Sequence, residues 1–553
     1  SKIVYKTTLK EKEHKLFDHE QLRNILDVIK QMIVQYQNRV PKSKMSLFQN
    51  MLNEHKKELH VFERKESTSI IYYILSFLDG KNKTQKEEIF THFIQKSVDF
   101  INNTLNLTNH LTSKRIKHIT YLMFIIRKIL SFYEKNEGDL TTSDYRKKTL
   151  REMQMVIEKT GLIKISLKFI NRYDNEKLLP FINAIFKMFC KMLKFGAASN
   201  EVVSRAGSNG QKLFFNTFNI KHDFEQVFSF MTETINKKIQ TIISNKFLIV
   251  RNKKKTLSIQ NQLLLDEYGG DIDENILEFL QLLCENHNRN LQLYLHKQSN
   301  FRRNYDLVTD TQHYLNILFN NFEPFLFNSL CRCFDLLIEM IQGPCFDSQL
   351  LLINSKLLVT INDLLKYYLI SETEQLYQKF PFVQAFNKSE FGYISNSYKE
   401  SQEEDEYQES TSFKRNFYKM STKQISLLTY KATILLLALV DSRNKFDPLY
   451  GNMTNVISSD TLEKLFTKVY FEHLTLISET NEINDYLIKL SDFNKANNIA
   501  DEIEDEFDLK QEKISKRANP EEYLILETGF NTYFLWRYYQ DYNSTFKNNE
   551  YNE

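Results

Sequence analysis

Two carboxylates stand in sequence surroundings that need a chemical explanation. Glu339 lies inside the apolar run 334–341, with Asp335 four residues earlier on the same helix face. Glu285 belongs to the polar run 284–290, which abruptly closes an apolar stretch. Because burying an unpaired carboxylate is costly, such a residue is paired, exposed on a narrow stripe, or bound to a cation. The local pattern alone favours an exposed stripe for Glu339 and a solvated surface position for Glu285.

Other candidate sites have weaker sequence support. The pair Cys331 and Cys333 has no second Cys or His pair, so a structural zinc site is not expected and both residues are predicted core cysteines. Residues 208–212 resemble a phosphate loop only faintly, because the Walker spacing is missing. Asp271 opens an alternation like that of an EF loop, but the required Gly and Glu are absent, so it is expected to cap the following helix. No acyl-transfer motif is present, and no enzymatic activity is predicted.

The composition favours helices and gives no case for nucleic acid. The 553 residues include only 12 Gly and 7 Pro, too few for a β-sandwich or an open α/β sheet. The 73 basic and 70 acidic residues leave a net charge of +3, so no nucleic-acid partner is predicted. Five cysteines, an odd number, favour a reducing compartment over a disulfide framework.

The apolar runs are too short to predict a membrane span. Residues 1–12 are polar and basic, without the apolar core of a signal peptide. The longest apolar run, 432–440, has nine residues, about half of a span. We therefore expect a soluble chain. Because the sequence begins without Met, it is expected to be part of a larger polypeptide.

Hydrophobic periodicity predicts helices through most of the chain. Segments 119–132 and 178–193 are apolar nearly all round, which is typical of helices packed between others in stacked repeats. Further helices are predicted at 304–320, 324–341 and 349–370. The predicted fold class is therefore all-α, built from helical repeats.

Three short motifs follow one another in the middle of the chain. They are Cys-Glu-Asn-His-Asn at 284–288 within Leu282–Gln292, Asn-Tyr-Asp-Leu-Val at 304–308, and Gln-Gly-Pro-Cys at 342–345. Together they resemble the homology-associated domain of inositol trisphosphate and ryanodine receptors, which are intracellular calcium-release channels. Residues 435–443, 158–163 and 196–218 resemble neighbouring parts of the same receptors, so that the similarity covers roughly residues 150 to 475.

The resemblance implies a site for two of these residues. In that family the central solenoid supplies two glutamates to an activating calcium site, and they match Glu285 and Glu339. Carboxylate oxygens are ligands that suit calcium. The family completes the site with a residue from beyond its pore helices, and no segment here matches that region, the pore or the ligand-binding β-trefoil. Glu285 and Glu339 are therefore expected to form part of a calcium site that is completed outside this chain.

The resemblance also implies an armadillo-like solenoid with a definite organisation. The predicted parts are a helical lead-in (1–65), an armadillo-like receptor-homology block (66–248), a linker (249–275), the receptor-homology-associated solenoid (276–475) with a mobile acidic loop (386–424), and an acidic and aromatic C-terminal tail (476–553). Residues 402–409 and 523–542 are predicted docking surfaces for other proteins.

The predicted function is that of a cytosolic calcium-sensing and coupling region of a ligand-gated calcium-release channel of the inositol trisphosphate receptor type. It would work at the cytosolic face of an endoplasmic-reticulum-like membrane, within a larger channel polypeptide or homo-oligomeric assembly. The alternative is a cytoplasmic scaffold protein built on the same solenoid.

Overall fold

The computed structural model describes a set of helical segments and the turns that join some of them. The described residues are 83–106, 113–134, 140–171, 178–194, 209–219, 225–244, 271–343, 345–370, 420–443, 447–478 and 520–550. Every regular element among these residues is a helix, which confirms the all-α fold class. The lead-in 1–65, the acidic segment 402–409 and most of the predicted linker and loop lie outside the described residues.

The chain divides into two compact units. The first unit comprises residues 1–234, 245–283 and 299–304, and the second comprises 235–244, 284–298 and 305–553. The predicted domain boundaries do not follow this division and stay predictions. The division does place both candidate glutamates in the second unit.

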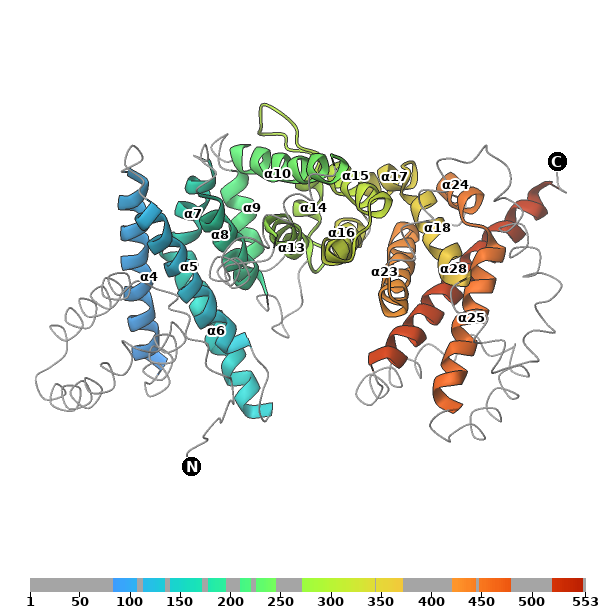
Figure 1. The fold of residues 1–553 in the computed structure, drawn as a ribbon, viewed down its shortest axis with the longest axis horizontal. Helices are drawn as coiled ribbons and strands as arrows, with labels where there is room; N and C mark the ends of the chain where they lie inside the picture. The colour runs from blue at the N-terminus through green and yellow to red at the C-terminus, as the bar shows by residue number, and fades with distance from the viewer. Residues whose placement is uncertain are drawn as a thin grey trace, which may run out of the picture. The chain divides into compact units, whose positions relative to one another are not determined.

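The first unit is a stack of helices around an aromatic core. Its helices are α4 (Lys83–Asn106), α5 (Ser113–Glu134), α6 (Leu140–Lys159), α7 (Leu162–Asn171), α8 (Leu179–Leu193), α9 (Asn209–Asn219), the first part of α10 (Glu225–Ile243), and α13 (Ile272–Cys284) up to Leu283. Helix α5 packs against α6 and α8, and α4 packs against α6 and α7 (Figure 1). Aromatic side chains of three helices pack together. The ring centroid of Phe279 on α13 lies 5.5 Å from that of Phe189 on α8 and 5.1 Å from that of Phe214 on α9.

The second unit is also built from packed helices. Its helices are the last part of α10, α14 (Arg289–His296), α15 (Leu307–Asn320), the 3-10 turn η5 (Pro324–Leu326), α16 (Phe327–Ile341), α17 (Phe346–Ile353), α18 (Leu357–Ile370), α23 (Thr422–Val440), α24 (Pro448–Val456), α25 (Ser459–Ser478) and α28 (Pro520–Glu550). Helix α16 packs between α15 and α23, and α28 packs against both α23 and α25 (Figure 1).

The described helices recur in a short–long–long order from α9 onward. The short helices α9, α14, α17 and α24 have 11, 8, 8 and 9 residues. Each is followed by two longer ones: α10 and α13, α15 and α16, α18 and α23, and α25 and α28. Armadillo repeats have two or three helices each, and the armadillo-like assignment of this chain stays a prediction. The superhelical arrangement of a solenoid stays a prediction.

Buried glutamines tie helices together within this pattern. The Nε2 atoms of Gln154, Gln292 and Gln349 each donate to two carbonyls, that of a helix C-cap residue and that of the residue three positions earlier. The acceptors are Lys191 and Lys194 of α8, Glu339 and Gln342 of α16, and Ala438 and Asp441 of α23. Gln211 donates to one carbonyl near the end of α13, that of Leu282. Because the last carbonyls of a helix lack partners within it, these amides satisfy them without water.

The predicted single helix 349–370 is wrong, because two helices occupy this segment. Helix α17 ends at Ile353 and α18 begins at Leu357. The hydroxyl of Ser355 accepts a hydrogen bond from the amide of Leu357 at 3.1 Å, which gives the second helix its own start. The polar residues 354–356 interrupt an otherwise continuous apolar pattern, and they mark the break.

Helix α23 is long and apolar enough, by length and composition alone, to cross a membrane. Its surroundings are nevertheless those of a core helix. It packs against α16, α18 and α28, and most of its apolar side chains are buried in these contacts. Its one central cation, Lys431, forms an ion pair with Asp335 of α16. We therefore interpret α23 as the central helix of the second unit.

Candidate metal centre

Glu285 lies in a tight turn that joins α13 to α14. Helix α13 ends at Cys284, so Glu285 follows the helix rather than lying within it. The next two residues, Asn286 and His287, have φ angles of 62° and 56°, in the left-handed region. Asn288 then caps α14, because its side chain accepts a hydrogen bond from the amide of Leu291. The polar run in the sequence is therefore a turn followed by a helix cap.

Glu339 lies near the C-terminal end of α16, half-buried. Asp335, one turn earlier, is ion-paired with Lys431 of α23. Burial, together with the negative charges of Glu285 and Asp335, raises the pKa of the Glu339 carboxyl from 4.5 to about 7. The two glutamates singled out in the sequence are therefore close enough for the charge of one to oppose ionisation of the other.

The turn of Glu285 is fastened to the end of α16 in two places. The Nε2 of Gln292 on α14 donates to the carbonyls of Glu339 at 2.7 Å and Gln342 at 2.8 Å. Gly343, with φ 76°, packs directly on His287, since a Cβ at this glycine would lie 2.5 Å from the His287 Cβ. The first and third sequence motifs therefore meet in space.

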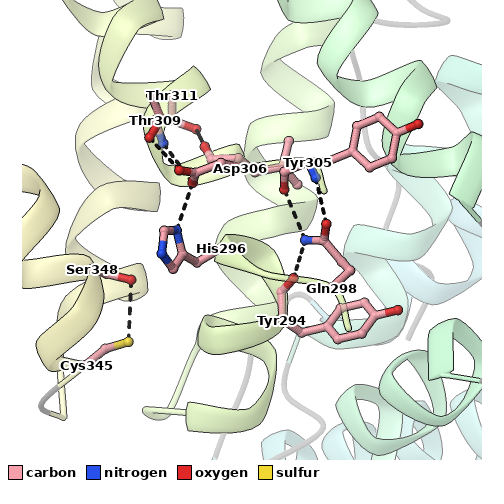
Figure 2. Close-up of polar contacts among 10 residues, drawn as sticks. Tyr294, His296, Gln298, Tyr305, Asp306, Thr309, Thr311, Cys345 and Ser348 are labelled. Carbon is pink, nitrogen blue, oxygen red and sulfur yellow. Dashed lines mark hydrogen bonds and ion pairs between the residues drawn. The ribbon is translucent and has the colours of Figure 1, made fainter. Parts of the chain in front are cut away.

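The second motif organises the start of α15, as Figure 2 shows. Asp306 caps this helix by accepting from the amide of Thr309, and its carboxylate lies 3.0 Å from Nδ1 of His296 at the end of α14. The side chain of Gln298 holds the backbone of Tyr305 through both the amide and the carbonyl (Figure 2). These contacts fix where α15 begins relative to α14.

The electrostatics of the two helix ends favour a cation. Glu285 follows the last residue of α13, and Glu339 lies in the last turn of α16. Each helix carries the negative end of its dipole there, so a carboxylate adds to existing negative potential. The neighbouring thiol adds no charge, because burial, Glu339 and Cys345 raise the pKa of Cys284. A divalent cation would relieve the repulsion that the two carboxylates otherwise bear.

The pair supplies only part of a metal coordination shell. Among the residues that the structure describes, no cluster of three or more His, Cys, Asp or Glu residues could hold a metal ion. Calcium takes six to eight oxygen ligands. Glu285 and Glu339 could thus provide two carboxylates, and a complete site needs oxygens from elsewhere.

The central part of the chain matches a known family. Residues 270–365 match the family described as RyR and IP3R Homology associated. The chain is also 38% identical over 86 residues to the inositol 1,4,5-trisphosphate receptor itr-1 of Caenorhabditis elegans, an alignment covering 14% of this chain and 3% of that receptor. Residues 270–365 are a RyR and IP3R homology associated domain. The resemblance to this receptor family is thereby confirmed, and the homology-associated domain contains both Glu285 and Glu339.

Sequence reasoning missed the role of the buried glutamines. Gln292 stands in the first motif, and Gln349 follows the third, yet neither was given a function from its residue type. Both are fully buried. The available signal was an amide side chain on an otherwise apolar helix face, as in α14, where Leu291, Tyr294 and Leu295 are also buried.

The predicted docking segment 523–542 lies on a helix that packs one face against its neighbours. It lies within α28, which packs against α23 and α25, and both Leu535 and Tyr539 are buried. Among the side chains of this helix that the structure describes, the rings of Phe534 and Tyr538 are exposed, at 41% and 47%. Docking of another protein at 523–542 stays a prediction.

Proposed function

We propose that this chain is the cytosolic calcium-sensing and coupling region of an intracellular calcium-release channel of the inositol trisphosphate receptor type. One observation carries the proposal: within the homology-associated domain, hydrogen bonds from Gln292 hold the end of α16, which carries Glu339, beside the turn that carries Glu285. The chain would work at the cytosolic face of an endoplasmic-reticulum-like membrane, as part of a larger homo-oligomeric assembly. It would act without enzymatic chemistry or nucleic acid.

Calcium binding would act by changing which arrangement of helices is favoured. Without the cation, the repulsion between the carboxylates weakens the contact between the α13–α14 turn and the end of α16. With calcium bound to both, the contact is stabilised, and any assembly state in which a further oxygen ligand reaches the ion gains population. Calcium changes the free-energy difference between the two states by the difference between their calcium-binding free energies.

The test is the calcium dependence of channel opening in the intact assembly. Glu339→Gln keeps the shape of the side chain and removes its charge, and we expect it to raise the calcium concentration for half-maximal activation about ten-fold or more. Asp347→Asn is the matched control, because Asp347 is an exposed carboxylate in the same domain. An unchanged calcium response in Glu339→Gln would contradict the proposal.

A scaffold function is the second candidate, and one observation favours it. Phe534 and Tyr538 are exposed aromatic residues one turn apart on α28, a spacing suited to a partner helix or loop. A scaffold would keep the helical repeats without calcium-dependent opening. The same recordings distinguish the two functions, since a scaffold predicts no channel current in any variant.

A further inference from the structure

The turn that carries Glu285 and the helix end that carries Glu339 are joined by a contact whose members are not metal ligands. Gln292 is fully buried, and one of its two hydrogen bonds goes to the carbonyl of Glu339 itself. The other goes to Gln342, the C-cap of α16. The amide thus holds the backbone of one candidate ligand, while its own helix begins directly after the turn that contains the other.

A second contact fixes the turn itself. Gly343 has a positive φ, and the space above its Cα is filled by the Cβ, Cγ and Nδ1 of His287. His287 itself needs a left-handed backbone, with φ 56°. Two residues in restricted conformations are therefore in van der Waals contact, and any movement of the turn must disturb one of them.

We propose that Gln292 and Gly343 are positioning residues that set the separation of the Glu285 and Glu339 carboxylates. This inference rests on the proposed calcium site and adds to it the part that holds the ligands in place. Two like charges would separate if free to do so, and a weak two-carboxylate site depends on their being held at one distance. Groups behind metal ligands commonly change affinity 10- to 100-fold without touching the ion.

The chain provides its own control for each contact. Gln349 makes the same two hydrogen bonds to the end of α23 in the next repeat, where the carbonyl three residues before the C-cap belongs to Ala438 instead of a glutamate. Gly161 has φ 79°, close to that of Gly343, but no atom of the described residues lies within 4 Å of a Cβ placed there. Substitutions at Gln349 and Gly161 therefore reproduce the local damage without disturbing the two carboxylates.

The experiment measures how strongly the carboxylates interact, with no metal present. The melting temperature of the 553-residue chain is determined at pH 8 for Glu285→Gln, Glu339→Gln and the double variant. The shifts are expected to be non-additive, because each substitution relieves the same repulsion. The cycle is repeated with Gln292→Met, Gly343→Ala, Gln349→Met and Gly161→Ala as backgrounds.

We expect the non-additivity to fall by about half or more with Gln292→Met and with Gly343→Ala, and to persist with Gln349→Met and Gly161→Ala. Loss of coupling in all four backgrounds, or in none, would overturn the inference. If Gln292→Met unfolds the chain, the Gly343→Ala cycle alone decides.

The calcium response of the intact assembly separates this inference from the proposed function. If Gln292→Met removes the coupling and Glu339→Gln leaves calcium activation unchanged, the positioning role stands and the calcium-sensing function fails. If Gln292→Met removes the coupling and Glu339→Gln also weakens calcium activation, both proposals stand. In that case Gln292→Met should raise the half-activating calcium concentration about ten-fold, and Gln349→Met should not.

Discussion

Gln292 and Gln349 make the same pair of hydrogen bonds in successive repeats, each from a short helix to the C-terminal carbonyls of the third helix of the same repeat. The C-caps that they bind also share one conformation, with φ and ψ of −61° and 147° at Gln342 and −54° and 130° at Asp441. An extended C-cap leaves the helix carbonyls open to an outside donor, and the glutamine supplies it. The shared geometry makes the glutamine amide a structural element of the repeat. In the first of the two repeats, the amide also binds the backbone of Glu339, a candidate calcium ligand.

Removal of the second amide should weaken the core of the second unit. Gln349→Met keeps the length of the side chain but leaves the Ala438 and Asp441 carbonyls without their donor, at a cost of about 1–3 kcal/mol. It also removes one of three acceptors of the Arg443 guanidinium, the one bound by Nε. Chemical denaturation should show the loss, with faster hydrogen exchange in the last turn of α23. Gln281→Met serves as control, because the buried Oε1 of Gln281 has no hydrogen-bond partner among the described residues and its loss should cost little.

Neutralising Glu339 should stabilise the chain at alkaline pH. A carboxyl whose pKa rises from 4.5 to about 7 on folding binds more protons in the folded state, so stability falls as pH increases across this range. Glu339→Gln removes that penalty, which is at most about 3 kcal/mol. We expect its melting temperature to exceed that of the parent chain at pH 8 and to match it near pH 4. Equal values at both pH values would show that Glu339 is not opposed by its neighbours.

Calcium activation of the intact assembly should depend on pH through the same residue. Protons and calcium compete for Glu339, and a group with pKa about 7 is mostly protonated at pH 6 and mostly ionised at pH 8. Apparent calcium affinity should therefore rise about ten-fold over this interval. In Glu339→Gln the slope should flatten. A slope that persists in this variant would assign the pH dependence to another group.

The buried cation of α25 should be more costly to remove alone than with its partner. Lys468 donates to the Tyr368 carbonyl, lies 4.3 Å from the centroid of the Tyr368 ring, and is 3.8 Å from Glu472. Lys468→Met leaves the Glu472 carboxylate without this cation and should cost about 3–5 kcal/mol. The double variant Lys468→Met with Glu472→Met should recover most of the loss. Thermal unfolding of the three proteins measures the difference, and equal losses in the single and double variants would refute the charge argument.

The sequence was sufficient for the fold class, whereas the calcium site of Glu285 and Glu339 stays a prediction. Scarce Gly and Pro and the 3.6-residue apolar period predicted helices, because both depend on local properties of the chain. The convergence of Glu285 and Glu339 was implied by the resemblance alone. Local pattern favoured surface positions for both, since it cannot show which distant helix end faces a given carboxylate.

The remaining features depend on contacts between distant residues. The Gln292 amide reaches Glu339 across 47 positions of sequence, and no periodicity marks that pairing. The break at 354–356 was missed because the apolar pattern continues on both sides of it. The polar run after α13 was recognised as unusual, but its cause, two left-handed residues and a helix cap, is visible only in the backbone.

Helix α23 also constrains the order in which the second unit is completed during synthesis. Its partners α16 and α18 precede it in the chain, whereas α28, which covers a further side, begins only at Pro520. A nascent chain therefore carries a membrane-like helix with one uncovered face until α28 has left the ribosome. Shortened chains that stop before Pro520 should keep that face uncovered for good, and they should recruit chaperones or aggregate in cells.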